Sequence, residues 1–210
     1  MNKRLTHVSL ARTRLAMFTW AAVVAACSSP APGAERAGRA IRHNQEDQMT
    51  CETELKRLDS GDWRGWSGLP AGCGPQQLAA VFQGGDTVIP GRLSGQPTPL
   101  RIYRSVNQKE EIHAWFDDAH VFLLTLDSPT TDMAADSILQ AWGSPEKKLH
   151  PLVGMHADAP QWIYASRGFT VFVRERDGGI ARVAAYRPSS VEYYEQYLGA
   201  TDKKHYVPRR

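Results

Sequence analysis

The spacing of apolar residues predicts a helix near the start of the folded part of the chain. Over Glu46–Asp59 the apolar side chains Cys51, Leu55 and Leu58 recur at i, i+4 and i+7, which places them on one side of a helix. Gly61 follows, and glycine is a typical residue just past a helix end. We therefore expect a helix whose apolar side faces the core.

Residues 61–74 form a segment that we interpret as a loop. It contains five glycines and a proline, a composition typical of irregular structure. It also contains Trp63 and Trp66, which can cover the edge of a core, form a platform for a carbohydrate, or contact a partner protein. Both tryptophans are therefore candidate partner-binding residues, with core cover as the alternative.

The rest of the chain shows an internal similarity with an offset of about 60 residues. A short helical pattern at 78–82 recurs at 138–142, and a strand at 101–105 recurs at 162–166. Two further strand-like runs follow each copy, at 111–116 and 119–126 and again at 169–175 and 179–186. Each copy is thus predicted to contain a helix, a loop and three antiparallel strands.

The second of these copies has a clear hairpin turn. Residues 176–178 read Arg-Asp-Gly, which suits a three-residue loop with Gly178 in the left-handed conformation. This turn predicts which residues face each other and point inward: Val173 with Ala181, Val171 with Val183, and Phe169 with Ala185.

A capping box at residues 189–192 predicts a final helix over 190–198. The apolar stripe of this helix turns Tyr194 inward. Tyr193 and Tyr197 are spaced i, i+4 on the outer side, where they are either ordinary surface residues or a partner-binding patch. We treat both tyrosines as candidate partner-binding residues.

Together these elements predict an α+β protein of two similar units, each a helix plus three antiparallel strands, able to form one continuous sheet. The units would span residues 45–127 and 128–199, followed by a polar tail at 200–210. Three bare strands cannot bury an apolar face, so a helix must cover one side of each unit. Two units side by side would leave one broad sheet face without helices, a surface suited to a protein partner.

The second unit resembles two known groups of proteins. The carrying residues are Trp142-Gly143-Ser144-Pro145, Trp162-Ile163-Tyr164, Asp177-Gly178 and Ile180. This order of helix, Gly-Ser-Pro, aromatic strand and Asp-Gly hairpin is similar to the SmpA/OmlA (BamE) lipoproteins and to the tandem β-lactamase-inhibitor-protein fold. The resemblance implies a protein that binds other proteins without chemistry or a cofactor.

The first 26 residues are typical of an export signal. Four basic residues and no acid precede an apolar run of 12 residues, too short to span a membrane. The run ends Val24-Ala25-Ala26-Cys27, which resembles the bacterial lipobox, and this resemblance implies that Cys27 is lipidated. An ordinary signal peptide cut near Ala26 is the alternative. Ser28, rather than aspartate, then favours the outer membrane, facing the periplasm.

Composition and charge narrow the function further. The hydrophobic share of 42% and charged share of 22% are those of a globular protein. The net charge of +3 becomes −1 once the four basic residues of the signal are removed, so nothing favours nucleic-acid binding. Residues 27–44 are rich in Ser, Pro, Ala, Gly and Arg and are interpreted as a flexible tether.

Two cysteines remain after Cys27. In an oxidising compartment Cys51 and Cys73 are expected to form a disulfide that joins the first helix to the loop. A metal site is the competing interpretation, which the absence of a CxxC motif and of a nearby histidine pair disfavours.

The first hairpin carries the residues nearest to a chemical site. With Asp117-Asp118 as a two-residue turn, His113 and His120 would be diagonal neighbours about 7–8 Å apart. They could hold a metal ion with a third ligand, but we interpret them as surface residues beside Trp115 and expect no metal. The two aspartates are interpreted as turn residues rather than as a catalytic pair.

The sequence contains no GxSxG, HExxH, P-loop or GxGxxG motif. We therefore expect no enzyme and no cofactor. The leading hypothesis is a lipid-anchored envelope protein that binds a protein partner or acts as a scaffold. The alternatives are an inhibitor or immunity protein directed at one enzyme, and an envelope hydrolase or carbohydrate-binding protein.

Overall fold

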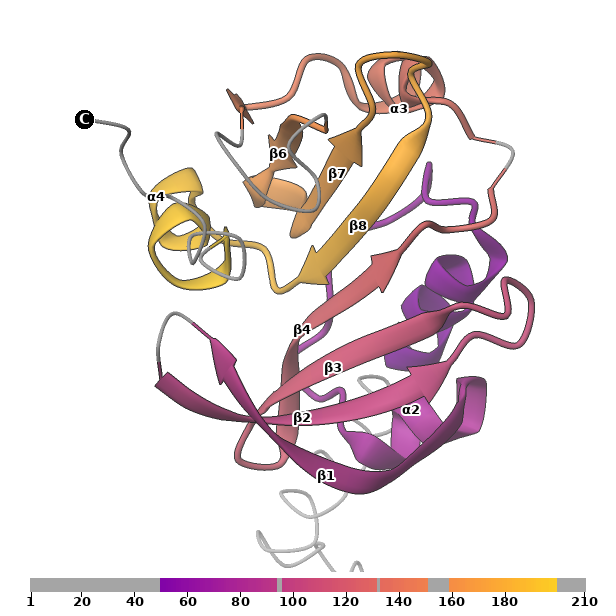
Figure 1. Ribbon diagram of the computed structural model, residues 1–210, viewed down its shortest axis with the longest axis vertical. Helices are drawn as coiled ribbons and strands as arrows, with labels where there is room; N and C mark the ends of the chain where they lie inside the picture. The colour runs from indigo at the N-terminus through magenta and orange to yellow at the C-terminus, as the bar shows by residue number, and fades with distance from the viewer. Residues whose placement is uncertain (1–49, 94–95, 132, 151–158, 200–210) are drawn as a thin grey trace, which may run out of the picture.

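The computed structural model describes residues 50–93, 96–131, 133–150 and 159–199. They form one eight-stranded antiparallel sheet with the order β1-β2-β3-β4-β8-β7-β6-β5 (Figure 1). The helices lie against this sheet, so the chain combines helices with one antiparallel sheet, in agreement with the predicted α+β class. The predicted signal, tether and tail lie outside the described residues, as does the predicted start of the first helix.

The strands follow the chain in two runs that meet at the centre of the sheet. Within each run a strand pairs with the next one along the chain, and β4 then pairs with β8 to join the runs. The bounds are β1 Gln83–Leu93, β2 Gln96–Arg104, β3 Glu111–Asp117, β4 His120–Asp127, β5 Lys147–Leu149, β6 Gln161–Tyr164, β7 Phe169–Val173 and β8 Ile180–Tyr186.

The helices are short. Residues 50–60 form the first described helix, and Gly61 follows it with a φ of 75°. The others are α2 Pro75–Val81, α3 Ala135–Trp142, a 3₁₀ turn η1 Ala165–Arg167, and α4 Val191–Tyr193, which continues as a π-helical turn η2 Tyr194–Leu198. The final helix thus agrees with the prediction, although its cap is Ser190, whose side chain accepts a hydrogen bond from the Tyr193 N–H.

One face of the sheet is covered by the first helix, the loop after it, α2 and α3. Leu55 and Leu58 from the helix and Ile138 from α3 are buried in the same cluster as Val171 and Val183 from the central strands. This is the helix-covered face that the apolar stripes of these segments predict.

The opposite face carries a second core. Its members include Ile163 and Phe172 from the strands and Tyr194 and Leu198 from the final helix. All five residues of β7 are therefore buried, because apolar layers lie on both of its sides. The expectation of one broad face without helices is wrong over this half of the sheet, since the final helix packs there.

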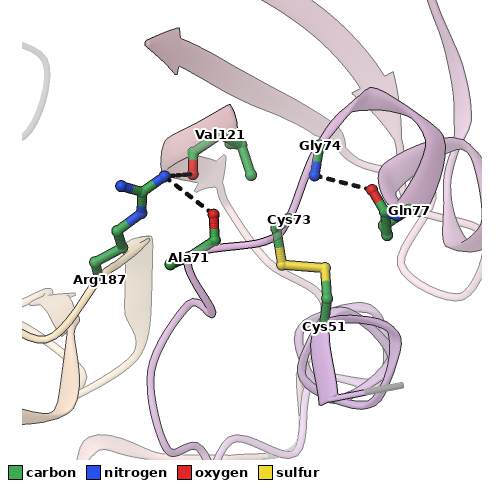
Figure 2. The surroundings of a disulfide bond; sticks show 7 residues. All are labelled: Cys51, Ala71, Cys73, Gly74, Gln77, Val121 and Arg187. Carbon is green, nitrogen blue, oxygen red and sulfur yellow. Dashed lines mark hydrogen bonds between the residues drawn. A yellow bond between two sulfur atoms is a disulfide. The ribbon is translucent and has the colours of Figure 1, made fainter. Parts of the chain in front are cut away.

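The predicted disulfide is confirmed (Figure 2). Cys51 on the first helix and Cys73 in the loop are joined by an S–S bond, and both are fully buried. The loop passes directly from Cys73 into α2, where the Gly74 N–H donates to Gln77 Oε1 at 3.0 Å. The bond therefore fixes the loop between two helices on the same face.

Two strands were not predicted. Each run has four strands rather than three, because β1 and β5 lie at the two edges of the sheet. Edge strands need only partial burial, so they lack the apolar alternation that identifies a strand from sequence. The residues of β1 are mostly exposed, and those of β5 are exposed or half-buried.

The two hairpins differ in how well sequence predicted them. In the second, the pairs Val171–Val183 and Phe169–Ala185 are confirmed, and Gly178 has a φ of 66°. A bulge after Phe172 pairs Val173 with Ile180 rather than with Ala181. In the first hairpin, the turn predicted at Asp117-Asp118 lies one residue later, so that Asp117 pairs with His120.

Candidate functional site

A groove of about 480 Å³ lies between the ends of β1 and β2, the turn between β3 and β4, and the final helix. Figure 1 shows these elements converging on one side of the sheet, with α4 facing the hairpin of β1 and β2. The lining residues are Leu93, Gln96, Pro97, Thr98, Pro99, Phe116, Asp117, Asp118, Phe122, Arg187, Tyr193, Tyr197 and Leu198. It is the candidate binding site, and we call it the tyrosine groove.

The first wall of the tyrosine groove is a strand edge without N–H donors. Pro90 of β1 lies opposite Pro99 of β2, and since neither has an N–H the two must form a non-hydrogen-bonded pair. Pro99 therefore faces away from β1, and Pro97, two residues earlier, faces the same way. The ladder between β2 and β3 ends at Leu100 and Trp115. This edge thus offers carbonyl oxygens but no N–H groups.

The opposite wall carries two exposed tyrosines. The rings of Tyr193 and Tyr197 lie 4.9 Å apart, and the residues are 47% and 46% exposed. The helix is held from its other side: the Tyr194 hydroxyl hydrogen-bonds Gln161 Oε1 at 2.8 Å, and its ring lies 5.1 Å from that of Tyr186. The prediction that Tyr194 faces inward and the other two outward is confirmed.

The turn between β3 and β4 brings two carboxylates to the tyrosine groove. Asp117 ends β3, and Asp118 follows in the left-handed conformation with a φ of 51°, which aspartate adopts more readily than most residues. Both are exposed, and no ion pair of either is found among the described residues. Phe122 of β4 lines the groove beside them.

Arg187, just after β8, is the cation among the residues that line the tyrosine groove. Its Nη2 donates to the carbonyl oxygens of Ala71 and Val121 at 3.3 and 3.4 Å (Figure 2). These bonds tie the segment after β8 to the loop that the disulfide fixes and to β4. The guanidinium Nε is buried and has no hydrogen-bond partner.

The two tryptophans are core residues, and their prediction as partner-binding residues is wrong. Trp63 and Trp66 are 0% and 1% exposed, and their rings lie 5.6 and 5.3 Å from that of Phe169. The Trp66 indole N–H donates to the Arg167 carbonyl at 3.0 Å, and that of Trp63 to the Leu58 carbonyl at 3.4 Å. Because neither ring is accessible to solvent, the interpretation of the two tryptophans as a platform for a carbohydrate is also wrong.

The histidines of the first hairpin do not form a pair. His113 lies opposite Thr125, and His120 lies opposite Asp117 at the turn, so they are not diagonal neighbours. His113 Nε2 is 3.9 Å from Glu111 Oε2. No group of three metal-binding side chains is found in the part of the chain that the structure describes.

The membrane-related predictions concern residues that lie outside the described chain, Cys27 among them. Within the described residues, no helix has the length and apolar character needed to cross a membrane. The lipid anchor thus stays a prediction.

Sequence reasoning identified the tyrosines of the groove but missed the strand edge and Phe122. The segment 96–99 reads Gln-Pro-Thr-Pro, and alternating prolines in a strand indicate an edge that cannot pair further. That signal was present, whereas the approach of this edge to the final helix depends on the order of strands in the sheet.

Comparison with known proteins gives one distant structural likeness. No family model and no curated protein matches the sequence. Among solved structures, a DUF4309 family protein (YjgB) from Bacillus subtilis is similar at a TM-score of 0.41 and 9% identity. The likeness covers 66% of this chain and 99% of that one.

Proposed function

We propose that the protein is an exported, lipid-anchored envelope protein that binds a protein partner through the tyrosine groove. The observation that carries this proposal is the pair of exposed rings of Tyr193 and Tyr197, which lie in contact at a tilted angle beside an open groove. Tyrosine is enriched at the centres of protein interfaces, because its ring buries a large area and its hydroxyl still forms a hydrogen bond. The helix that carries the rings is fixed from behind, so little order is lost on binding.

Export and anchoring rest on the sequence and on the disulfide. The basic and apolar segments before Cys27 are those of a signal, and the Cys51–Cys73 bond is of a kind that persists in oxidising compartments. A tether at residues 27–44 would let the domain reach partners near the membrane surface. We propose the outer membrane, facing the periplasm, as the location.

We also propose that the two runs of strands are similar units. Ala185 lies 61 positions after Leu124, and these two residues face each other where β4 pairs with β8. The same offset relates the strand at Arg101 to the strand at Trp162. A twofold axis through the Leu124–Ala185 pair would therefore exchange the two runs. This arrangement supports the tandem organisation implied by the resemblance to inhibitor and BamE-like proteins.

Photo-crosslinking in living cells tests the binding role. A photoreactive phenylalanine analogue at position 193 should give a discrete adduct with another envelope protein, and Tyr197→Ala should reduce its yield. The matched control places the same analogue at Val88, which is 53% exposed on β1 and does not line the groove. Equal adducts from both positions, or none from position 193, would contradict the proposal.

The anchor is tested separately. Cys27→Ala should abolish labelling with palmitate and leave the signal uncleaved by the lipoprotein signal peptidase, whereas Cys51→Ala with Cys73→Ala should leave labelling intact. Unchanged labelling of the Cys27 variant would remove the lipid anchor and leave the binding role to be judged by the crosslinks.

The alternative function, an inhibitor of one enzyme, is tested by an activity assay of the crosslinked partner. If the protein crosslinked at position 193 is an enzyme, adding the purified chain should lower the activity of that enzyme. The Tyr193→Ala variant should then inhibit less. A partner whose activity is unchanged identifies the scaffold or binding role instead.

A further inference from the structure

Resting on the proposed function, we infer that the tyrosine groove binds an extended segment of the partner protein through its lysine or arginine side chains. Three features of the lining lead to this assignment: unpaired carboxylates, a strand edge that only accepts hydrogen bonds, and exposed aromatic rings. Each comes from a different element, and together they define the chemistry of the occupant.

The carboxylates of the turn supply the charge. Asp117 and Asp118 line the groove, and neither forms an ion pair among the described residues. An ammonium or guanidinium group donated by a partner would form charge-assisted hydrogen bonds with them, which are stronger than neutral ones. Two exposed acids outside the groove are by contrast already paired: Asp62 with Arg64 at 2.7 Å and Asp177 with Arg174 at 3.1 Å.

The strand edge supplies acceptors alone. The carbonyl oxygens of Pro97 and Pro99 face away from β1, and a proline has no N–H to donate. A segment lying against this edge must therefore bring the donors, as its backbone N–H groups and lysine or arginine side chains do. A full ladder of strand pairing cannot form here, so side-chain donors decide the specificity.

The aromatic rings supply a surface for the same cation. A guanidinium or ammonium group is attracted to the electron-rich face of a tyrosine or phenylalanine ring. The chain uses this contact elsewhere, with Lys148 Nζ 4.3 Å from the Trp162 ring centroid and the Arg182 guanidinium carbon 5.5 Å from that of Phe172. The exposed rings of Tyr193 and Tyr197 offer a comparable face to a partner.

Arg187 makes an acidic segment the competing occupant. Its Nε is buried without a partner, although Nη2 already donates to two carbonyl oxygens. The lining therefore contains one cation, which already forms hydrogen bonds, and two carboxylates without an ion pair among the described residues. The net charge of the lining favours a basic occupant. The second competing occupant is basic: the last eleven residues of the chain, 200–210, carry Lys203, Lys204, Arg209 and Arg210.

The test uses the full lipid-anchored chain in detergent and two fluorescent glycine–serine peptides. One peptide carries two arginines and the other carries two glutamates in the same positions. Fluorescence anisotropy should show binding of the arginine peptide, weakening with salt because the screening length falls from about 10 Å at 0.1 M to about 3 Å at 1 M. The double variant Asp117→Asn with Asp118→Asn should weaken it at least about tenfold.

Matched controls keep the test interpretable. Asparagine also adopts the left-handed conformation of residue 118, so the turn is preserved in the double variant. Asp86→Asn removes an exposed carboxylate on β1 outside the groove and should leave binding unchanged. Preference for the glutamate peptide, or equal loss from the Asp86 variant, overturns the inference. Binding of the arginine peptide only after truncation at residue 199 makes the tail the occupant and also overturns it.

Failure of the inferred cationic occupant can be distinguished from failure of the proposed binding role. A crosslink from position 193 that persists in the double aspartate variant, with no arginine-peptide binding, refutes the cationic occupant and leaves the binding role standing. Absence of any crosslink refutes the binding role itself.

Discussion

Lys147 on β5 and Glu195 on the final helix form an ion pair, with Nζ 2.6 Å from Oε1. The contact joins one edge strand of the sheet to the helix that carries the groove tyrosines. Both side chains are partly exposed, at 43% and 27%. The pair therefore helps to set the position of a functional wall from an edge strand that sequence patterns did not predict.

Removing this ion pair should loosen the helix more than it lowers overall stability. We expect Lys147→Ala to reduce the free energy of unfolding by about 0.5–1 kcal/mol, since partly exposed ion pairs contribute little. Hydrogen exchange at residues 191–198 should accelerate, and crosslinking from position 193 should fall. Lys148→Ala, on the same strand but over the Trp162 ring, is the control and should leave exchange in the helix unchanged.

The disulfide should contribute through the unfolded chain. Closing a loop between residues 22 positions apart removes conformational freedom worth about 3 kcal/mol. We therefore expect reduction to lower the free energy of unfolding by about 2–4 kcal/mol in urea titrations. Cys51 and Cys73 should resist alkylation in the folded protein until a reductant is added. Rapid alkylation of both in the native oxidised protein would refute the bond.

The parts of the fold that sequence predicted are those with strong local signals. The apolar spacing of Leu55 and Leu58, the Arg-Asp-Gly turn at 176–178 and the start of the final helix near Ser190 each depend on a few neighbouring residues, so periodicity and turn chemistry identified them, although the cap is Ser190 and not Ser189 as the capping box predicts. The edge strands and the register of the first hairpin depend on neighbours far along the chain. A bulge between Trp115 and Phe116 shifts that register, and no residue type marks it.

The site was predicted in part for the same reason. The i, i+4 spacing of Tyr193 and Tyr197 puts them on one side of a helix, and the structure leaves that side exposed. Trp63 and Trp66 occur in a glycine-rich loop that reads as a surface, yet the loop folds back over Phe169 and buries both. Burial of a loop side chain depends on tertiary contacts, so sequence could not separate the two pairs.

Stability should fall in alkali because buried phenols, among them Tyr164 and Tyr186, resist ionisation. Burial raises the pKa of Tyr164 to about 12, and burial also raises the pKa of Tyr186 above its ordinary value. The unfolded chain loses these protons near pH 10, so the folded state binds more protons above that pH and stability decreases as pH rises. Below about pH 10 the two states bind equally and no dependence from these groups is expected.

Urea titrations across this pH range test the assignment. Tyr164→Phe should flatten the decline above about pH 10, because it removes one of the linked protons. Tyr197→Phe, at a ring that is 46% exposed, is the control substitution. An identical slope in the Tyr164 variant and the unmodified chain would contradict the burial argument.

Asp59, at the end of the first helix, holds the segment that connects β2 to β3. It is 4% exposed, and its Oδ1 accepts hydrogen bonds from Ser105 Oγ at 2.6 Å and from the Val106 N–H at 2.9 Å. Its Oδ2 accepts from Asn107 Nδ2. An acid at a helix C-terminus is unfavourable to the helix dipole, so these bonds, and not the helix, explain its place.

Substitutions at this carboxylate should rank by the donors that they leave unpaired. We expect Asp59→Ala to cost about 3 kcal/mol, because several buried donors lose a charged acceptor. Asp59→Asn should cost less, since one oxygen remains, and Ser105→Ala should cost about 1 kcal/mol because it removes one donor and keeps the carboxylate. Asp62→Ala is the control: Asp62 is exposed and pairs with Arg64, so its loss should change stability by less than about 1 kcal/mol. Equal effects of the Asp59 and Asp62 variants in urea titrations would show that the bonds to the 105–107 segment do not stabilise the fold.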